Sequence, residues 1–337
     1  MNPALPASSV TATVNYDQDG IQHGFLKLPY SHDGSAWGAI MTPICVIKNG
    51  DGPTALLTGG NHGDEYEGIT GLLKLSNQLD NKDIQGRVII IPMMNQPAVE
   101  GASRVSPIDN GNMNRAFPGH PYGSMTERMA DYFTRYLIPL CDTALDIHSG
   151  GKTLDILPFA AAHRLPDKAL ESRCSEGARL FGAPYMFFME EIDATQLYDT
   201  AVEDQGKVFV TTELRGGGTT TPDTIAMVDR GIHNFLVFSG VLNQAYIPPP
   251  SNPISLEIPD SDCYLHAEHR GILELCASLG DEIHKGDLIA RIYSIERTGE
   301  PPVEYHAKRS GILAARRHLA NVNMGDTFAV LAVKISS

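Results

Sequence analysis

Four short apolar runs, each ending at or close to a polar side chain, constrain the fold more than any other feature of the sequence. They are TALLTGG (54–60), RVIIIPMMN (87–95), TALDIHS (143–149) and KVFVTTEL (207–214). Apolar residues at helical spacing predict helices between these runs, over residues 67–79, 126–137 and 167–181. This alternation, from about residue 23 to 245, indicates an α/β domain with a largely parallel or mixed sheet. Because ligands bind beyond the carboxyl ends of strands in such sheets, we expect the functional site there.

A proline-rich stretch divides the chain. Residues 246–260 carry five prolines and predict a linker or domain boundary. We therefore expect a catalytic domain over residues 1–245 and a β-rich domain over residues 250–337, where short alternating runs are punctuated by glycine. Segments that start at Arg270 and Ser310 match at an offset of 40 residues and predict two similar β-halves around a pseudo-twofold axis. The first half resembles the barrel-sandwich fold of lipoyl and biotinyl carrier domains, but no carrier lysine is evident, so we interpret it as structural.

Charge and cysteine content narrow the class of partner and the compartment. Asp and Glu outnumber Lys and Arg by 40 to 26, and the net charge of -14 disfavours nucleic acid and anionic membranes as partners. The five cysteines form no CxxC pair, so we expect neither a disulfide framework nor a cysteine-rich zinc site. The first 20 residues lack the basic and apolar parts of a secretion signal, which favours a cytoplasmic protein. A homo-oligomer is left open.

A metal site is the sharpest local hypothesis. His62 and Glu65 stand three residues apart in GGNHGDEYEG, directly after an apolar run. Catalytic zinc commonly takes two histidines and one glutamate and leaves a fourth position for water. Such a pair also occurs by chance, but the surrounding glycines allow backbone to approach a ligand closely. His148 in DIHSGG supplies a third ligand from another strand end, so we expect one Zn²⁺ per chain at these three residues.

The remaining site residues are expected around this metal. Asp146 lies on the same strand face as His148 and could fix the tautomer of that imidazole, or serve only as a solvated or capping carboxylate. Glu213 ends the fourth run before three glycines and is the candidate general base, although a buried acid near a cation could be structural. Arg104, Asn114 and Arg115 could provide donors to an oxyanion or a substrate carboxylate; a surface ion pair is the alternative for Arg115.

The motifs HGDE, NMNR, DIHSGG and TTEL, in this order, resemble the succinylglutamate desuccinylase and aspartoacylase family. This family is a branch of the zinc carboxypeptidase superfold, so the resemblance implies a mixed sheet flanked by helices, and the β-rich domain also fits the family plan. It implies zinc at His62, Glu65 and His148. It implies a base and proton shuttle at Glu213 and carboxylate recognition by Asn114 and Arg115. Arg104 would then polarise the scissile carbonyl.

Within this family the chain most resembles the N-acetyl-L-2,4-diaminobutyrate deacetylases of ectoine degradation. The resemblance implies hydrolysis of the amide of a small N-acyl amino acid, with deacylation of N-acetylaspartate or succinylglutamate, or carboxypeptidase activity, as alternatives. A non-catalytic binding module is the alternative of another class. A second substrate amine should meet an acidic residue, for which the candidates are Glu190, Glu191 and Asp193, although a solvated loop is the other interpretation. We interpret His266 and His269 as solvated rather than as a second metal pair.

Overall fold

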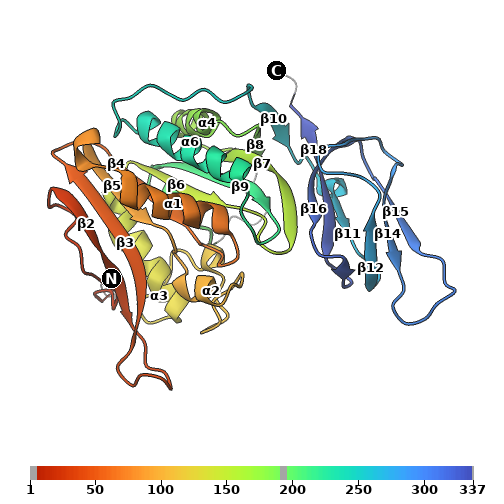
Figure 1. Cartoon of the computed structure of the whole chain (residues 1–337), viewed down its shortest axis with the longest axis horizontal. Coiled ribbons are helices and arrows are strands. Elements are labelled where there is room, and N and C mark those ends of the chain that lie inside the picture. The colour runs from red at the N-terminus through yellow and green to blue at the C-terminus, as the bar shows by residue number, and fades with distance from the viewer. Residues whose placement is uncertain (1–5, 190–195, 336–337) are drawn as a thin grey trace.

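The computed structural model of the chain describes residues 6–189 and 196–335 and has a mixed α/β fold built on one large sheet (Figure 1). The strands of its N-terminal part are β1 (Thr11–Ala12), β2 (Gly20–Pro29), β3 (Ala39–Asn49), β4 (Thr54–Gly59), β5 (Gly86–Ile91), β6 (Thr143–His148), β7 (Leu154–His163), β8 (Tyr185–Met189) and β9 (Val208–Gly216). The helices are α1 (Tyr66–Gln78), α2 (Gln96–Glu100), α3 (Met125–Tyr132), α4 (Lys168–Phe181), α5 (Tyr198–Glu203) and α6 (Pro222–Phe238). The four predicted strands and the three predicted helices lie where the sequence placed them.

The middle of the sheet is parallel. Strand β4 pairs in parallel with β5 and β6, and β6 pairs in parallel with β9, so all four strands end at the same edge of the sheet. Strand β7 then runs antiparallel to β9, which makes the sheet mixed. In the β6–β9 register His148 stands beside Glu213. The strand pairing alone therefore brings two of the predicted site residues together.

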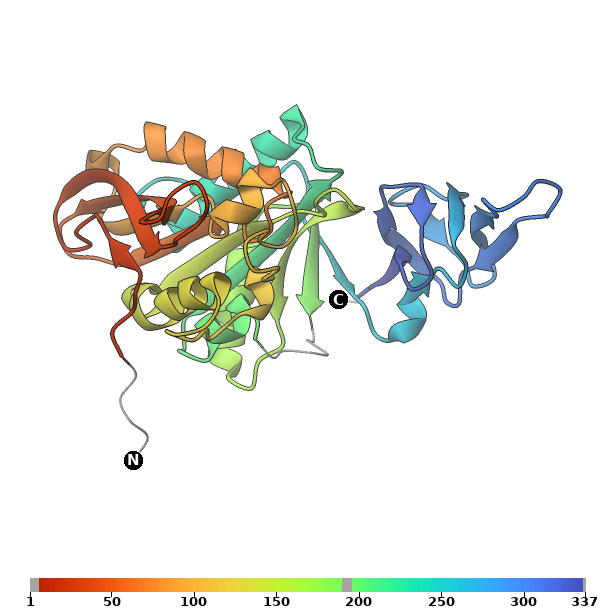
Figure 2. The same cartoon turned by 90° about the horizontal axis from the view of Figure 1, so that it is seen from below.

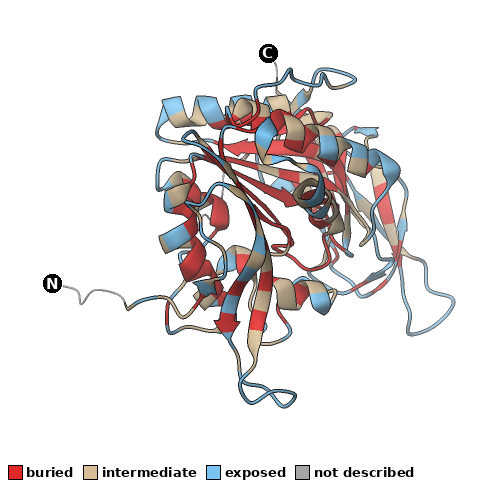
Figure 3. Cartoon of the chain, turned by 60° about the vertical axis from the view of Figure 1, so that its left-hand side comes forward, coloured by how far each residue is buried: buried red, intermediate tan, exposed pale blue. Residues whose placement is uncertain are grey.

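Helices cover both faces of the sheet, which explains why its central strands are apolar on both sides (Figures 1 and 3). One buried cluster joins the strands to α1, α4 and α6 through side chains such as Leu72, Phe181 and Phe235. A second cluster joins the opposite face to α3 and α5 through side chains such as Met129 and Tyr198. Burial on two faces fixes the strand register, because a shift by one residue would exchange the two clusters.

Local signals explain where the helices begin and end. Ser124 caps α3 in a capping box with Glu127, and Asp167 accepts backbone hydrogen bonds at the start of α4. Gly182 ends α4 in the left-handed conformation that glycine adopts without strain. The predicted helix over residues 126–137 changes character along its length, because its last turn, Phe133–Leu137, is a π-helix.

The C-terminal part is built almost entirely of strands. They are β10 (Ile254–Glu257), β11 (Tyr264–His266), β12 (Gly271–Leu275), β13 (Glu282–Ile283), β14 (Leu288–Tyr293), β15 (Val303–His306), β16 (Gly311–Arg317), β17 (Asn321–Val322) and β18 (Thr327–Lys334). The two matching segments fold alike, because β12 pairs with β14 as β16 pairs with β18. The two-residue strand of each half pairs with the first strand of the other half, β13 with β16 and β17 with β12. The internal repeat is thus present as two similar halves that exchange their short strands.

The interpretation of residues 246–260 as a linker is wrong for the four residues of β10. This strand pairs in parallel with β8 and antiparallel with β18, so the large sheet runs on into the C-terminal part (Figures 1 and 2). The alternating residues Ile-Ser-Leu-Glu can pair because the prolines lie outside this stretch. The division of the chain into domains at residues 245–250 stays a prediction.

A second connection between the parts lies beside β10. Strand β16 pairs with β7, and Asp155 on β7 accepts hydrogen bonds from Arg316 on β16. The same carboxylate lies 3.2 Å from Arg215 on β9. One buried aspartate therefore links three strands across the junction. Among the described residues, no helix combines the length and apolar character needed to cross a bilayer.

A substitution at Gly68 tests the packing of α1 on the sheet. A Cβ at this position would lie 2.6 Å from the carbonyl oxygen of Ile147 on β6. Alanine favours a helix over glycine by about 1 kcal/mol, but overpacking costs about 1–3 kcal/mol and cannot be relieved here without moving backbone. We expect Gly68→Ala to lower the free energy of unfolding in urea, whereas Gln78→Ala on the exposed side of α1 leaves it nearly unchanged. A stabilised Gly68→Ala variant would contradict this packing.

Candidate active site

The loop from β4 to α1 carries two of the predicted metal ligands. It leaves the sheet after Gly59 and presents His62 and Glu65, which are both buried. Gly63 lies between them, and a Cβ at this position would come within 1.9 Å of the backbone of Ala98. Only glycine therefore fits here, and the close approach fixes the path of the loop. The third predicted ligand, His148, is the last residue of β6.

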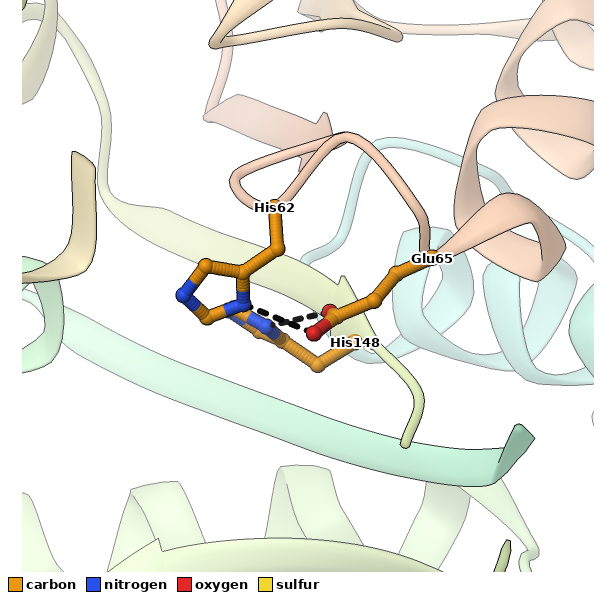
Figure 4. Close-up of side chains that lie close together, drawn as sticks. All are labelled: His62, Glu65 and His148. Atoms are coloured by element: carbon orange, nitrogen blue, oxygen red, sulfur yellow. Dashed lines mark hydrogen bonds and ion pairs between the residues drawn. The ribbon is translucent and has the colours of Figure 1, made fainter. Parts of the chain in front are cut away.

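The three predicted ligands converge on one point (Figure 4). Nδ1 of His62 lies 2.7 Å from one oxygen of the Glu65 carboxylate, and Nδ1 of His148 lies 2.8 Å from the other. Each residue offers one ligand atom, and these atoms all lie within 4.8 Å of one another. Two nitrogens and one carboxylate oxygen form a set of donors that can hold a metal ion.

Both imidazoles are held by their second nitrogen. Nε2 of His148 lies 2.7 Å from Asp146, and Nε2 of His62 lies 3.2 Å from the amide oxygen of Asn112. An acceptor at Nε2 favours the tautomer that carries its proton there, which leaves the Nδ1 lone pair directed at Glu65. A lone pair and a carboxylate repel each other unless a proton or a cation lies between them. The donor set therefore fits a cation, which would take the place of these protons.

Asp146 is itself fixed by neighbouring strands. Its carboxylate accepts hydrogen bonds from Thr58 at 2.7 Å and from Asn61 at 3.1 Å. Burial opposes ionisation of Asp146, but the His148 imidazole and these donors outweigh it and lower the pKa of the carboxyl. Asp146 thus orients His148, which is the first of the two roles that the sequence left open for it.

The charges in the cluster compensate one another. Burial opposes the ionised form of Glu65, but the imidazoles of His62 and His148 outweigh it and hold the pKa of Glu65 below its usual range. Burial likewise opposes the charged form of His148, yet the carboxylates of Asp146 and Glu65 raise the pKa of this imidazole well above its usual value. The buried carboxylates thus strongly favour a positive charge at this point.

Glu213 lies on β9 next to the cluster. Burial raises the pKa of its carboxyl to about 8, and the nearby charge of Glu65 adds to this shift. One of its oxygens has no hydrogen-bond partner among the described residues. A carboxyl that lacks a local partner beside a candidate metal site is well placed to exchange protons with a ligand.

A cavity of about 260 Å³ opens onto this cluster. Seven of the residues singled out from the sequence line it, namely His62, Arg104, Asn114, Arg115, Asp146, His148 and Glu213. The guanidinium of Arg104 is 3.4 Å from Glu65, while Arg115 is exposed and donates to the backbone oxygen of Asn114. The side-chain oxygen of Asn114 accepts from the backbone NH of Tyr198 at the start of α5. Asn114 therefore also fixes the start of α5, which forms part of the cavity wall. The sequence did not indicate this second role of Asn114.

Three further polar residues at the site were missed from the sequence. Asn112 holds His62, and its place in NMNR was a signal that could have been used. His163 at the end of β7 and Asp199 on α5 line the cavity, but no motif marks them. They reach the site only because β7 returns antiparallel beside β9 and α5 packs on the sheet.

Two other expectations concern residues away from this cluster. Glu190, Glu191 and Asp193 lie outside the described residues. His266 and His269 are exposed and bond separately to Thr327 and Tyr305, consistent with solvated side chains. Over residues 6–189 and 196–335, the cluster of His62, Glu65 and His148 is the only group found with metal-ligand spacing.

Comparison with known families assigns the chain to one of them. Residues 51–239, more than half of its length, match the model of the succinylglutamate desuccinylase/aspartoacylase catalytic domain. The chain belongs to this family. It is accordingly an enzyme of the hydrolase class, and the family resemblance read from the four motifs is confirmed.

Similar proteins span the whole length of the chain. An N-alpha-acetyl-L-2,4-diaminobutyric acid deacetylase of Halomonas elongata is 58% identical over 330 residues, which cover 98% of this chain and 96% of the relative. The product-bound ectoine utilization protein EutE of Ruegeria pomeroyi is 49% identical with a TM-score of 0.95, covering 97% of this chain and 99% of that one. A protein of Silicibacter sp. TM1040 described as a succinylglutamate desuccinylase is 50% identical, also with a TM-score of 0.95, over 98% and 100% of the two chains.

Asp146→Asn tests the anchoring of His148. An asparagine can turn its NH₂ group toward Nε2, which favours the tautomer that removes the lone pair from Nδ1. Loss of such a partner typically weakens metal binding about 10- to 100-fold, and we expect this loss in a competition titration with a zinc chelator. The exposed Asp262→Asn serves as the control for the change in charge. Unchanged zinc affinity in Asp146→Asn would contradict the anchoring role.

Proposed function

We propose that the chain is a zinc-dependent deacetylase of N-acetyl-L-2,4-diaminobutyrate that acts in ectoine degradation. The observation that carries this proposal is the convergence of two Nδ1 atoms on the Glu65 carboxylate, beside a cavity that His62, His148 and two arginines line. The relative from Halomonas elongata, named for this activity, supports the choice of substrate. The name of the Ruegeria pomeroyi protein supports the pathway.

Zinc is the proposed metal, held by His62, Glu65 and His148. Two histidine nitrogens and one glutamate oxygen are a donor set typical of catalytic zinc, whereas calcium and magnesium prefer oxygen ligands alone. When bound, zinc supplies Lewis acidity, which lowers the pKa of water and polarises a carbonyl group.

Glu213 is the proposed general base. Its carboxylate takes the proton of the attacking water and returns it to the amide nitrogen, so that acetate and a free amine leave. A cation beside it favours the ionised carboxylate, because the positive charge counteracts the effect of burial on the pKa. One oxygen of Glu213 has no hydrogen-bond partner among the residues that the structure describes, and this supports the role, since a structural carboxylate would be expected to have local donors.

Two arginines and an asparagine are proposed to orient the substrate. Arg104, which lies beside Glu65, donates to the carbonyl oxygen as negative charge develops on it. Arg115 has the planar fork that suits a carboxylate, and its position on the cavity wall supports a role in holding the substrate carboxylate. Asn114 adds its amide NH₂, because only its oxygen is used by Tyr198.

The finer fold assignments are also part of the proposal. We propose a zinc-carboxypeptidase-like arrangement for the N-terminal part, supported by the mixed sheet with helices on both faces and the site at its strand ends. We propose a barrel-sandwich-like arrangement for the C-terminal part, supported by its two exchanged halves. All five cysteines are free thiols, which supports work in the reducing cytoplasm.

A desuccinylase is the second candidate, because the protein from Silicibacter sp. TM1040 carries that name at 50% identity. Hydrolysis of N-acetyl-L-2,4-diaminobutyrate, N-acetylaspartate and succinylglutamate should be compared, before and after chelation and with zinc restored. We expect the diaminobutyrate derivative to have the highest kcat/KM, and chelation to abolish this activity until zinc is added. Full activity after chelation would contradict the proposed dependence on zinc. A preference for succinylglutamate would favour the desuccinylase.

Glu213→Gln tests the base directly. Glutamine keeps the shape of the side chain but cannot accept a proton, so kcat should fall by about 100-fold or more. Zinc content should stay at about one per chain, because Glu213 is not among the three proposed ligands. Glu176→Gln, an exposed position on α4, is the matched control. Wild-type turnover in Glu213→Gln would rule out the proposed base.

A further inference from the structure

The strand that carries the proposed base ends in a strained turn. Glu213 lies on β9, and two residues later the backbone of Arg215 has a φ of 66°. This left-handed conformation is uncommon for residues other than glycine, because the Cβ atom crowds the backbone there. The three residues that follow also have positive φ, but they are glycines, namely Gly216, Gly217 and Gly218. Arg215 is thus the member of this turn whose conformation the surrounding structure must hold in place.

A buried aspartate holds the guanidinium of Arg215. Nε of Arg215 lies 3.2 Å from Oδ1 of Asp155 on β7, and Nη2 donates to Oδ2 at 3.3 Å. Arg316 on β16, in the C-terminal part, donates to the same Oδ2 from two nitrogens, at 3.0 and 3.2 Å. Hydrogen bonds between guanidinium and carboxylate groups are among the stronger ones in proteins. Two arginines from different parts of the chain therefore fix one carboxylate at the end of β9.

The backbone of Arg215 is bonded to the loop that follows His148. Its carbonyl oxygen accepts a hydrogen bond from the backbone NH of Gly150 at 2.9 Å. In the same loop, the backbone NH of Ser149 donates to the carboxylate of Glu65 at 3.2 Å. Neighbouring residues of this loop are thus bonded to the turn after β9 and to a proposed metal ligand. The position of the turn is therefore tied to that of the metal cluster.

Strand pairing alone does not fix the end of β9 on its other side. Ile156 on β7 pairs with Arg215, and Phe159 pairs with Glu213, so β7 uses one residue more than β9 over this stretch. Such a bulge disrupts the ladder and changes the local twist, which leaves the direction of Glu213 less well determined by pairing with β7. The restraint at Arg215, directly beyond the bulge, makes up for this.

The C-terminal part contacts the turn at a second point. The backbone NH of His318, just beyond β16, donates to the carbonyl oxygen of Thr153 at 2.8 Å. The ring of His318 lies against Gly217, where a Cβ would come within 3.0 Å of it. Arg316 and His318 are two residues apart, so one short segment of the C-terminal part packs on the turn. Figure 1 shows β16 on the side of the C-terminal part that faces β7 and β9.

We infer that Arg215 is a positioning residue for Glu213 and that the C-terminal part, through Arg316, holds Arg215 in its left-handed conformation. The inference rests on the proposed function, because it concerns the orientation of the proposed base. Arg215 is not among the described residues that line the cavity, so it acts through the backbone rather than on the substrate. A misplacement of about 1 Å at a reacting group can cost about 100-fold in rate. The β-rich part thereby gains a role in the reaction.

The test compares two substitutions at the same position, Arg215→Ala and Arg215→Gly. Both remove the guanidinium, but only glycine adopts a positive φ without strain. kcat and KM for N-acetyl-L-2,4-diaminobutyrate are measured per bound zinc, so that loss of folded protein does not count as loss of turnover. Arg215→Ala should lose roughly 10- to 100-fold in kcat with KM nearly unchanged, whereas Arg215→Gly should stay within about threefold of the wild type.

A second substitution tests the contribution of the C-terminal part. Arg316→Met keeps a long side chain but removes the donors to Asp155, and it should lower kcat by roughly 10-fold. In the Arg215→Gly background the same change should cost less than about twofold, because the turn no longer has to be held against strain. Arg291→Met removes an arginine of the same part from its ion pair with Glu304, far along the chain from this turn, and should leave kcat unchanged.

The backbone itself gives a result that does not depend on turnover. A crystal structure of the wild type should show Arg215 with positive φ and with its guanidinium on Asp155. Negative φ at this residue would overturn the inference. So would equal kcat in Arg215→Ala and Arg215→Gly, or a loss from Arg316→Met that is as large with glycine at position 215 as with arginine. A wild type inactive on this substrate would instead remove the proposed function, and the positioning role with it.

Discussion

The burial of one carboxylate between two imidazoles is the constraint on which the rest of the site depends. Glu65 is almost fully buried, and both of its oxygens face the Nδ1 atom of a histidine. A buried carboxylate is tolerated only where positive charge and hydrogen bonds compensate it. The loop after β4 and the end of β6 are shaped to provide this compensation, which explains the close packing at Gly63 and the anchoring of His148 by Asp146.

The sheet brings the other residues of the candidate site to this cluster. The parallel strands β4, β6 and β9 end at one edge, so side chains from distant parts of the sequence meet there without any long-range signal in the sequence. The register of β6 with β9 sets Glu213 beside His148. The NMNR segment then borders the cavity, where Asn112 holds His62, a proposed metal ligand, and Asn114 holds the start of α5. Rigid strands position the proposed base and one proposed ligand, and loops carry the other two.

The sequence predicted the parts of the molecule that depend on local pattern. Apolar runs gave the four central strands, and the glycines around His62 indicated the tight loop. The convergence of His62, Glu65 and His148 could be predicted because each of them ends a strand or lies in the loop that follows one. What the sequence could not indicate depends on tertiary contact: β10 joins the sheet despite its neighbouring prolines, and Asp199 and His163 reach the cavity through the packing of α5 and β7.

We propose that a divalent metal ion occupies the point where His62, Glu65 and His148 converge. Anomalous diffraction from crystals of the enzyme, recorded on either side of the zinc absorption edge, measures this directly. We expect a single zinc peak in contact with Nδ1 of both histidines and the carboxylate of Glu65. A peak held by other residues, or none in crystals grown with zinc, would contradict it.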